Sequence, residues 1–230
     1  MKKKTNYSYI GISFVILVFG ILFIPKIVNR INNEEVVDKD RHHLERKGGS
    51  EELPLTTIGT VPAFHFVDQN NVLINNETYA GKVYVVEFFF STCPSICPIM
   101  NQNMIKVQNA FPEEPHLGFA SFTINPIYDS PEVLKEYAQK YGIVNPNWHL
   151  LTGDQEAIYR LANEGFNLYV GQTPEVEGGF EHSGFFALID KKGDIRSRID
   201  ENGNPIIYYD GLEDEGIDML KEDIQRLLNE

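Results

Sequence analysis

The chain has 230 residues, 42% of them hydrophobic, which is enough for one ordinary globular domain with additional segments but short for two. Its formal net charge of −13 argues against nucleic-acid binding, because contacts to phosphates need clustered lysine and arginine. Only two cysteines occur, Cys93 and Cys97, and a disulfide closing so short a loop would add little stability, so the pair points to chemistry.

The N-terminal segment is typical of a membrane anchor. Lys2 to Lys4 precede an almost uninterrupted apolar run from Tyr9 to Ile24, which with its flanks is about as long as a helix that crosses a bilayer. No small-residue cleavage site follows, so we expect residues 1–28 to form a cytoplasmic N-terminus and a transmembrane anchor. The lysines then place the remaining chain on the periplasmic or exterior side of a bacterial cytoplasmic membrane.

A polar, charged segment follows over residues 29–52, and it is almost free of large hydrophobic side chains. Such a segment cannot bury enough apolar surface to fold by itself. We therefore expect a flexible linker there, followed by one folded domain over residues 53–230.

The strongest strand signal lies at residues 83–90, where β-branched and aromatic residues follow one another almost without interruption, as in a strand covered on both faces. This run leads directly into the two cysteines. Apolar residues then recur at helical spacing and predict a helix that ends before Pro112. That helical stripe comprises Ile96, Met100, Met104, Val107 and Phe111.

A second buried strand is predicted over residues 117–124. A helix should begin near Asp129, because Asp129 or Ser130 can cap it and Pro131 suits its first turn. We expect this helix to run to Gly142.

Residues 148–151 predict a short strand. Asp154 then caps a further helix, which should end near Gly165. We expect Gly165 to be the left-handed residue that follows the last helical turn.

The end of the chain has a different pattern. Residues 185–190 and 195–199 flank a Lys-Lys-Gly-Asp turn and predict a hairpin, and residues 212–228 predict an amphipathic helix. Strands that alternate with helices, followed by a hairpin and a final helix, indicate an α/β sheet with an antiparallel portion. This is the layout of a thioredoxin-like domain.

Cys93 and Cys97 stand where the first predicted strand passes into a helix, and their spacing of four should place both sulfurs on one helical face. The positive end of the helix dipole stabilises a thiolate, so both thiols should ionise more easily than a free cysteine. Pro98 either lies in the first helical turn or kinks the helix.

This pair of thiols is compatible with three kinds of chemistry. Two soft thiolates suit Cu(I), and one added imidazole gives a three-coordinate site acceptable to Cu(I) and Cu(II). A structural zinc site needs four ligands, and the chain has no second cysteine pair to supply them. The third alternative is a plain dithiol/disulfide couple without a metal.

Four features of the folded region occur together in a fixed order. They are the buried strand, a C-P-x-x-C-P motif from Cys93 to Pro98, the stretch from Asn125 to Leu134, and Glu181-His182-Ser183 before the strand that starts at Phe185. In this set the chain resembles the Sco/SenC family of copper-binding proteins, over about residues 55 to 228.

The resemblance implies that Cys93, Cys97 and His182 match the family's copper ligands. Thioredoxin-like redox proteins place a cis-proline just before the strand that faces their cysteines, and His182 with Ser183 occupies the corresponding slot here. The other histidines of the domain have no comparable placement, and we expect structural or surface roles for them. They are His65, His116 and His149.

The resemblance also matches Asp129 to an acidic residue of the family's D-P-x-x-D-[ST]-P stretch. Two positions depart from the family pattern. Ser95 stands where the family often has Asp, and Asn125 replaces the first Asp of that stretch. Both departures remove negative charge that could lie near a copper ion.

Glu87 is a carboxylate in an otherwise apolar strand, six residues before Cys93. A buried carboxylate must be paired, protonated or close to a cavity. Thioredoxins resemble this chain in carrying a buried acid at that offset, which helps to move protons during thiol exchange. The alternative is that Glu87 faces a wet edge of the sheet or a lysine such as Lys82.

Together these features predict a membrane-anchored copper metallochaperone resembling those that deliver copper to the binuclear copper centre of cytochrome c oxidase. It would act without enzymatic turnover, by ligand exchange with the oxidase's copper-containing subunit or another copper protein. The alternative is a thiol-disulfide oxidoreductase for cysteines of the oxidase or other exported proteins, with Cys93 attacking. A redox or copper sensor is a third hypothesis. His182 separates the first two, because only copper binding needs it.

Overall fold

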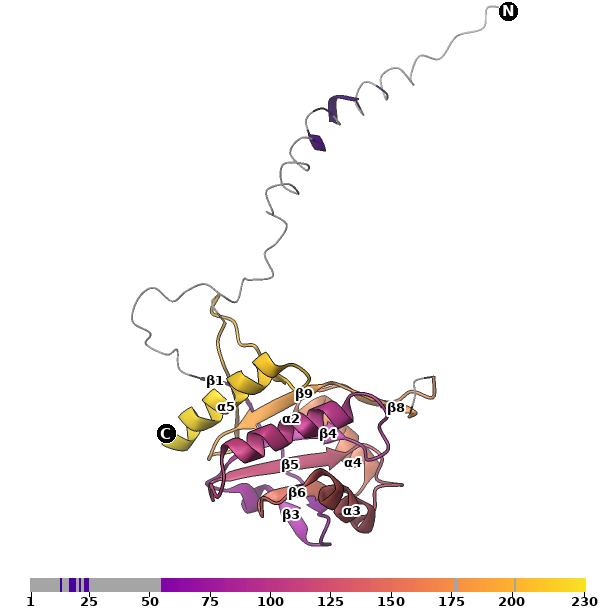
Figure 1. The fold of residues 1–230 in the computed structure, drawn as a ribbon, viewed down its shortest axis with the longest axis vertical. Coiled ribbons are helices and arrows are strands. Elements are labelled where there is room, and N and C mark those ends of the chain that lie inside the picture. The colour runs from indigo at the N-terminus through magenta and orange to yellow at the C-terminus, as the bar shows by residue number, and fades with distance from the viewer. Residues whose placement is uncertain are drawn as a thin grey trace, which may run out of the picture. The chain divides into compact units, whose positions relative to one another are not determined.

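The structure, a computed structural model, describes residues 55–175, 178–200 and 202–230, together with 13, 17–19, 21, 23 and 24. Internal contacts divide the chain into Met1–Glu52 and Leu53–Glu230, and the second unit contains the fold (Figure 1). The predicted anchor and linker lie largely outside the described residues and stay predictions. Within the described part of the chain, no helix has both the length and the apolar character of a membrane span.

A seven-stranded sheet forms the centre of the domain, in the order β1-β10-β9-β4-β5-β6, with β11 paired to β9. The strands of this sheet are β1 (Thr56–Thr60), β4 (Val83–Phe89), β5 (Leu117–Thr123), β6 (Trp148–Leu151), β9 (Phe185–Ile189), β10 (Asp194–Ser197) and β11 (Tyr209–Asp210). Two small hairpins lie outside it, formed by β2 (His65–Val67) with β3 (Leu73–Asn75) and by β7 (Val170–Gln172) with β8 (Phe180–His182).

The helices are α2 (Cys97–Ala110), α3 (Pro131–Tyr141), α4 (Gln155–Arg160) and α5 (Asp214–Asn229), with a short 3₁₀ turn η1 at Asn76–Tyr79. Strands β4, β5 and β6 are parallel, whereas β9 and β10 add the antiparallel portion. The predicted α/β layout with a C-terminal hairpin and helix is therefore confirmed.

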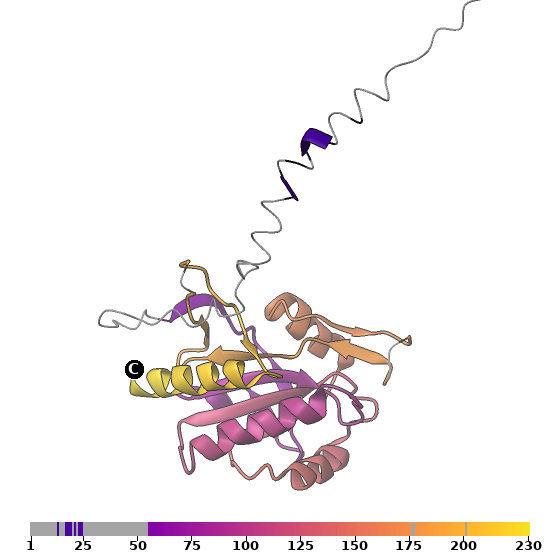
Figure 2. The ribbon, with the colours of Figure 1, turned by 45° about the horizontal axis from the view of Figure 1, so that its top comes forward.

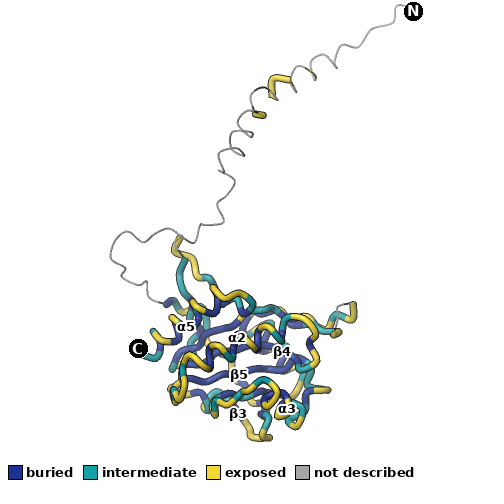
Figure 3. Tube along the Cα trace, viewed as in Figure 1, coloured by how far each residue is buried: buried dark blue, intermediate teal, exposed yellow. Residues whose placement is uncertain are grey.

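Strand β4 is buried on both faces of the sheet. All of its residues are buried, and alternation sends neighbouring side chains to opposite faces. Phe89 packs against Tyr137 of α3, with ring centroids 5.2 Å apart, whereas Phe88 packs against Phe166 at 5.8 Å. Helices α2 and α5 lie side by side over one face (Figures 1 and 2). Figure 3 shows the buried strands between partly exposed helices.

Helix α2 begins at Cys97 and has Pro98 in its first turn, where a proline fits the helix without kinking it. The centre of the predicted stripe is buried, because Met100, Met104 and Val107 have no exposed surface, whereas Ile96 and Phe111 flank the helix and are partly buried. Burial of each such side chain contributes roughly 2 kcal/mol to folding. Cys93 lies in the turn before the helix, so the two cysteines do not share a helical face as expected.

Helix α3 has the predicted ends. The Ser130 side chain accepts a hydrogen bond from the Val133 N–H at 3.4 Å, and Pro131 is the first helical residue. Gly142 follows the helix with φ +73°, the left-handed conformation that glycine adopts without steric cost.

The predicted cap of α4 is also present, since Asp154 accepts from the Ala157 N–H at 2.8 Å. The helix continues as a π-helical turn over Leu161–Gly165. The expectation for Gly165 is wrong, because the left-handed glycines of the described chain do not include it. A Cβ at Gly165 would instead lie 2.7 Å from Pro62 Cγ, so close packing requires the glycine.

Candidate functional site

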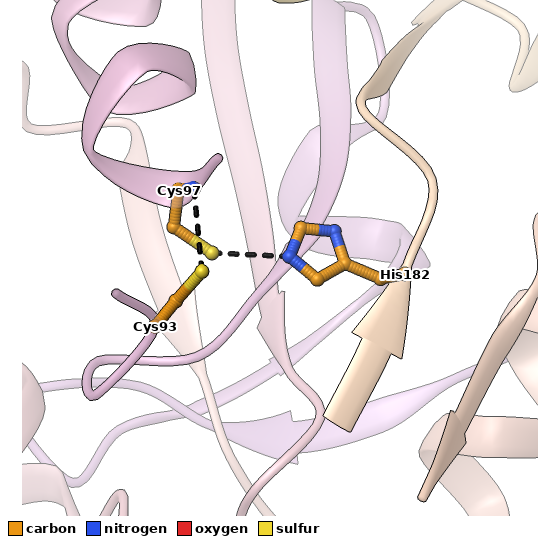
Figure 4. A group of neighbouring side chains, drawn as sticks. All are labelled: Cys93, Cys97 and His182. Carbon is orange, nitrogen blue, oxygen red and sulfur yellow. Dashed lines mark hydrogen bonds between the residues drawn. The ribbon is translucent and has the colours of Figure 1, made fainter. Parts of the chain in front are cut away.

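Cys93, Cys97 and His182 lie together at the edge of the sheet where β4 ends (Figure 4). Their potential ligand atoms all lie within 4.8 Å of one another. No other group of histidine, cysteine and acidic side chains among the described residues is placed to hold a metal ion. The structure thus brings together the three residues that the sequence singled out.

The two sulfurs meet at the start of α2. The Cys97 backbone N–H donates to Cys93 Sγ at 3.4 Å, so an otherwise unpaired amide of the first helical turn faces the sulfur. Cys93 is 9% exposed and Cys97 only 1%, and both thiols are free. Cys93 is therefore the sulfur that another molecule can approach.

The two thiols have opposite pKa shifts. A hydrogen bond from the Cys97 side chain lowers the pKa of Cys93 and outweighs burial, which raises it, and the hydrogen bond from the Cys97 backbone N–H also lowers it. Burial, together with the neighbouring Cys93 sulfur, raises the pKa of Cys97. The metal-free pair therefore holds one thiolate on Cys93 and one proton on Cys97.

His182 presents one ring nitrogen to this pair. Its Nδ1 lies 3.0 Å from the carbonyl oxygen of Ser183, which can only accept, so Nδ1 carries the hydrogen. The lone pair is then on Nε2, which lies 3.0 Å from Cys97 Sγ. A metal-ligating histidine is commonly oriented by such a hydrogen bond through its second nitrogen.

The Phe90 ring supports the imidazole from the side. It meets the His182 ring edge to face, with centroids 5.9 Å apart and an interplanar angle of 83°. The Phe180 ring lies 5.3 Å from Phe90, so the same ring also contacts the strand that carries His182.

A cavity of about 210 Å³ opens beside the sulfurs and the imidazole. Its lining comprises Phe90, Cys93, Ser95, Ile96, Phe180, Glu181 and His182. A larger cavity of about 680 Å³ lies between β2 and α4, and neither cysteine lines it. We place the chemistry in the smaller cavity, because its walls carry the soft and titratable ligands.

Asp129 has a structural role next to the site. The carboxylate is fully buried and accepts from the Ser91 N–H at 3.1 Å, from the Ser91 hydroxyl and from the Thr123 hydroxyl. These bonds join the end of β5 to the turn that carries Cys93. Asp129 therefore fixes the backbone of the cysteine turn and does not face the sulfurs.

Glu87 has no exposed surface, so the expectation of a wet edge or of Lys82 as partner is wrong. The Lys82 ammonium donates to the Thr78 carbonyl oxygen at 2.7 Å. Glu87 Oε1 accepts from the Ser121 hydroxyl at 2.6 Å, while Oε2 has no hydrogen-bond partner among the described residues. Burial raises the pKa of Glu87 to about 7, although the Ser121 hydrogen bond and nearby His182 act against this.

The remaining histidines lie outside the cluster, as expected. His149 Nδ1 lies 2.9 Å from the Asp68 carboxylate, which makes it a structural residue, and His65 and His116 are exposed. At one position that departs from the family pattern, Ser95 Oγ lies 3.8 Å from Cys93 Sγ. A neutral hydroxyl thus stands beside the more accessible sulfur.

The family model described as SCO1/SenC matches residues 55–215, which is more than half of the chain and includes all three clustered residues. The chain belongs to the SCO1/SenC family. The predicted resemblance and the thioredoxin-like α/β fold of the domain are thereby confirmed.

Three solved structures illustrate this relationship. A SCO1/SenC family lipoprotein from Bacillus anthracis is 30% identical, with a TM-score of 0.65 over 75% of this chain and 98% of that one. BsSco, described as a Sco family cytochrome c oxidase assembly protein with a disulfide switch, is 25% identical, with a TM-score of 0.61 over 75% and 95%. Yeast Sco1 with copper bound is 27% identical, with a TM-score of 0.55 over 73% and 89%.

Sequence reasoning did not anticipate the support given by Phe90 or the part played by Asp129 in fixing the cysteine turn. Phe90 reads as one more apolar residue of a buried strand, and only tertiary structure reveals its contact with His182. Asp129 had a usable signal, because a carboxylate beside a helix cap that is not itself the cap needs another partner.

The buried carboxylate of Glu87 makes a pH prediction. Its folded-state pKa lies above the ordinary value of 4.5, so folding favours the neutral form and stability falls as pH rises from about 4.5 through about 7. Above that range the loss should reach roughly 3 kcal/mol. We expect Glu87→Gln to remove this loss, so the variant should gain stability relative to the parent between pH 5 and 8, measured by urea unfolding. Glu132→Gln, on the exposed start of α3, is the matched control and should show no such gain. Parallel stability profiles for parent and Glu87→Gln would contradict the prediction.

Proposed function

We propose that this protein is a copper metallochaperone that holds one copper ion with Cys93, Cys97 and His182 and delivers it to the binuclear copper centre of cytochrome c oxidase. The observation that carries the proposal is the 3.0 Å approach of His182 Nε2 to Cys97 Sγ, with Nδ1 bonded elsewhere. That geometry directs an imidazole lone pair at two sulfurs, a donor set that copper accepts in both oxidation states.

The donor set favours copper over zinc. Structural zinc takes four protein ligands, and the described residues supply three at this place. Thiolate sulfur is a soft ligand that suits Cu(I), and the Irving–Williams order places Cu(II) above zinc. Copper-bound yeast Sco1 supports the assignment, since it shares this fold at 27% identity.

Release of the metal is the second requirement of a chaperone. Copper bound by both sulfurs displaces the proton of Cys97, and that proton can return when the ion leaves. Cys93 is the more exposed sulfur, so an incoming cysteine of the partner can replace it first. The partner is the copper-containing subunit of the oxidase or another copper protein, as the naming of BsSco as an oxidase assembly protein supports.

The sulfurs make the first prediction for copper. The reduced protein should bind one copper ion, and either Cys93→Ser or Cys97→Ser should abolish stoichiometric binding, because a hydroxyl is a poor ligand for Cu(I). Metal analysis after gel filtration measures this. Ser95→Ala is the matched control and should keep its copper, because Ser95 is no ligand in this proposal. Full copper occupancy in a sample whose cysteines are disulfide-bonded would contradict the site.

The His182 imidazole leads to the second prediction for copper. Copper(II) bound by both sulfurs and His182 should show a sulfur-to-copper charge-transfer absorption. His182→Ala should lose that band and weaken Cu(II) binding by about 100-fold, or roughly 3 kcal/mol, while Cu(I), which accepts two thiolates alone, should change far less. The exposed His116→Ala is the control. An unaltered Cu(II) affinity and spectrum in His182→Ala would remove the three-ligand site.

A thiol-disulfide oxidoreductase is the second candidate, and the pairing of an easily ionised Cys93, the more accessible of the two sulfurs, with a fully buried Cys97 favours it. The disulfide switch of BsSco is in keeping with such chemistry. In this reading Cys93 attacks a substrate disulfide and Cys97 resolves the mixed disulfide. The His182→Ala experiment separates the candidates, because dithiol exchange should continue without the imidazole.

We further propose that residues 1–28 anchor the protein once in a bacterial cytoplasmic membrane, with residues 29–52 as linker and residues 53–230 facing the periplasm or exterior. The apolar run supports the membrane span, and the description of the Bacillus anthracis relative as a lipoprotein supports association with a membrane. The full chain should sediment with membranes and resist carbonate extraction, whereas a fragment beginning at Glu51 should be soluble and folded. Recovery of the full chain in a soluble fraction would refute the anchor.

A further inference from the structure

The distance between the imidazole and the sulfurs depends on how two separate parts of the fold pack against each other. His182 ends β8, which belongs to the small β7–β8 hairpin and not to the central sheet. The cysteines belong to the turn between β4 and α2. The base of the hairpin is held by Asn163, whose side chain accepts from the Val170 N–H at 3.1 Å and donates to its carbonyl at 3.0 Å. The position of His182 also depends on how the loop of this hairpin packs against the cysteine turn.

Gly178, in the loop between β7 and β8, packs closely against the cysteine turn. A Cβ built there would lie 3.0 Å from Pro94 Cδ and 3.2 Å from two ring atoms of Phe90. Gly178 also has φ +91°, a conformation that side chains rarely adopt. Phe90 is 1% exposed and contacts the His182 ring, so it cannot move aside without disturbing the imidazole.

The neighbouring Gly179 provides an internal comparison. It is also left-handed, with φ +77°, but a Cβ there would meet no atom of the described residues within 4 Å. An alanine at either position therefore carries similar backbone strain, and only the alanine at 178 would also push against Pro94 and Phe90. The pair separates local strain from the seating of the hairpin.

We propose that Gly178 is a positioning residue for the copper site: its missing side chain lets the β7–β8 hairpin rest on Pro94 and Phe90, which sets His182 against the two sulfurs. The inference rests on the proposed function, because it assigns the contact a purpose in metal binding. Bonds from a metal to nitrogen and sulfur tolerate displacements of only about 0.2 Å, so a small outward shift of the hairpin affects the imidazole first. The sulfurs keep their positions, since neither belongs to the hairpin: Cys93 lies in the turn after β4, and Cys97 is the first residue of α2.

The test compares Gly178→Ala with Gly179→Ala in the full-length chain, purified in detergent. In the copper-loaded protein, Gly178→Ala should weaken Cu(II) binding at least about tenfold and shift the sulfur-to-copper absorption, while its Cu(I) affinity changes by less than about threefold. Gly179→Ala should stay within about threefold of the parent in both affinities, and both variants should unfold in urea in one cooperative transition. Equal Cu(II) affinities and spectra for the two variants would overturn the inference.

A metal-free measurement separates this inference from the copper proposal. The NMR shift of the His182 Hε1 proton depends on the facing Phe90 ring, so Gly178→Ala should move that resonance and Gly179→Ala should not. If the parent bound no copper, the proposed function would fail, and the NMR comparison would still decide on the positioning role. Pro94→Ala provides the rescue, because removing Cδ relieves one contact. In the Pro94→Ala background, Gly178→Ala should weaken Cu(II) binding by less than about threefold, compared with about tenfold in the parent. A full tenfold effect in that background would contradict the contact with Pro94.

Discussion

The parallel register between β4 and β5 is the constraint on which the site depends. It pairs seven residues, from Val83 with Leu117 to Phe89 with Thr123. Because parallel strands end at the same edge, the register delivers the cysteine turn and the loop of Asp129 side by side. It also places Ser121 opposite Glu87, which gives the buried carboxylate its hydrogen bond. A slip of one residue would turn every one of these side chains to the other face of the sheet.

Much of this architecture could be predicted from local sequence. The long apolar runs that became β4 and β5 and the caps at Ser130 and Asp154 have physical causes that act within a few residues. The small hairpins could not be predicted, because a strand of three residues, such as β7 or β8, is too short to show a period of two. Gly165 shows the opposite failure, since a familiar local role was assigned to a glycine that tertiary packing requires.

The residues of the site also differ in whether local sequence or tertiary packing reveals them. Cys93 and Cys97 form a local motif that the sequence shows directly, although it left copper, zinc and dithiol chemistry open, whereas His182 was found through resemblance to a family. The groups that orient the ligands were hidden, because they act through contacts between distant segments. Phe90 and Gly178 illustrate this, as one is an ordinary apolar residue in sequence and the other an ordinary loop glycine. Local sequence thus specifies which atoms can bind the metal, and the fold specifies where they stand.

The separation of the ligands along the chain links metal binding to folding. Cys93 and Cys97 are neighbours even in an unfolded chain, whereas His182 follows Cys97 by 85 positions and joins it only after the intervening strands have paired. Closing so long a loop costs conformational entropy, which the folded domain has already met. A metal that needs only the two sulfurs can therefore bind the chain while it is still unfolded. A metal that also needs the imidazole binds only the native state and therefore stabilises the folded domain. The oxidation state of copper would then decide whether the ion also binds the unfolded chain or binds only the native state and so stabilises it against unfolding.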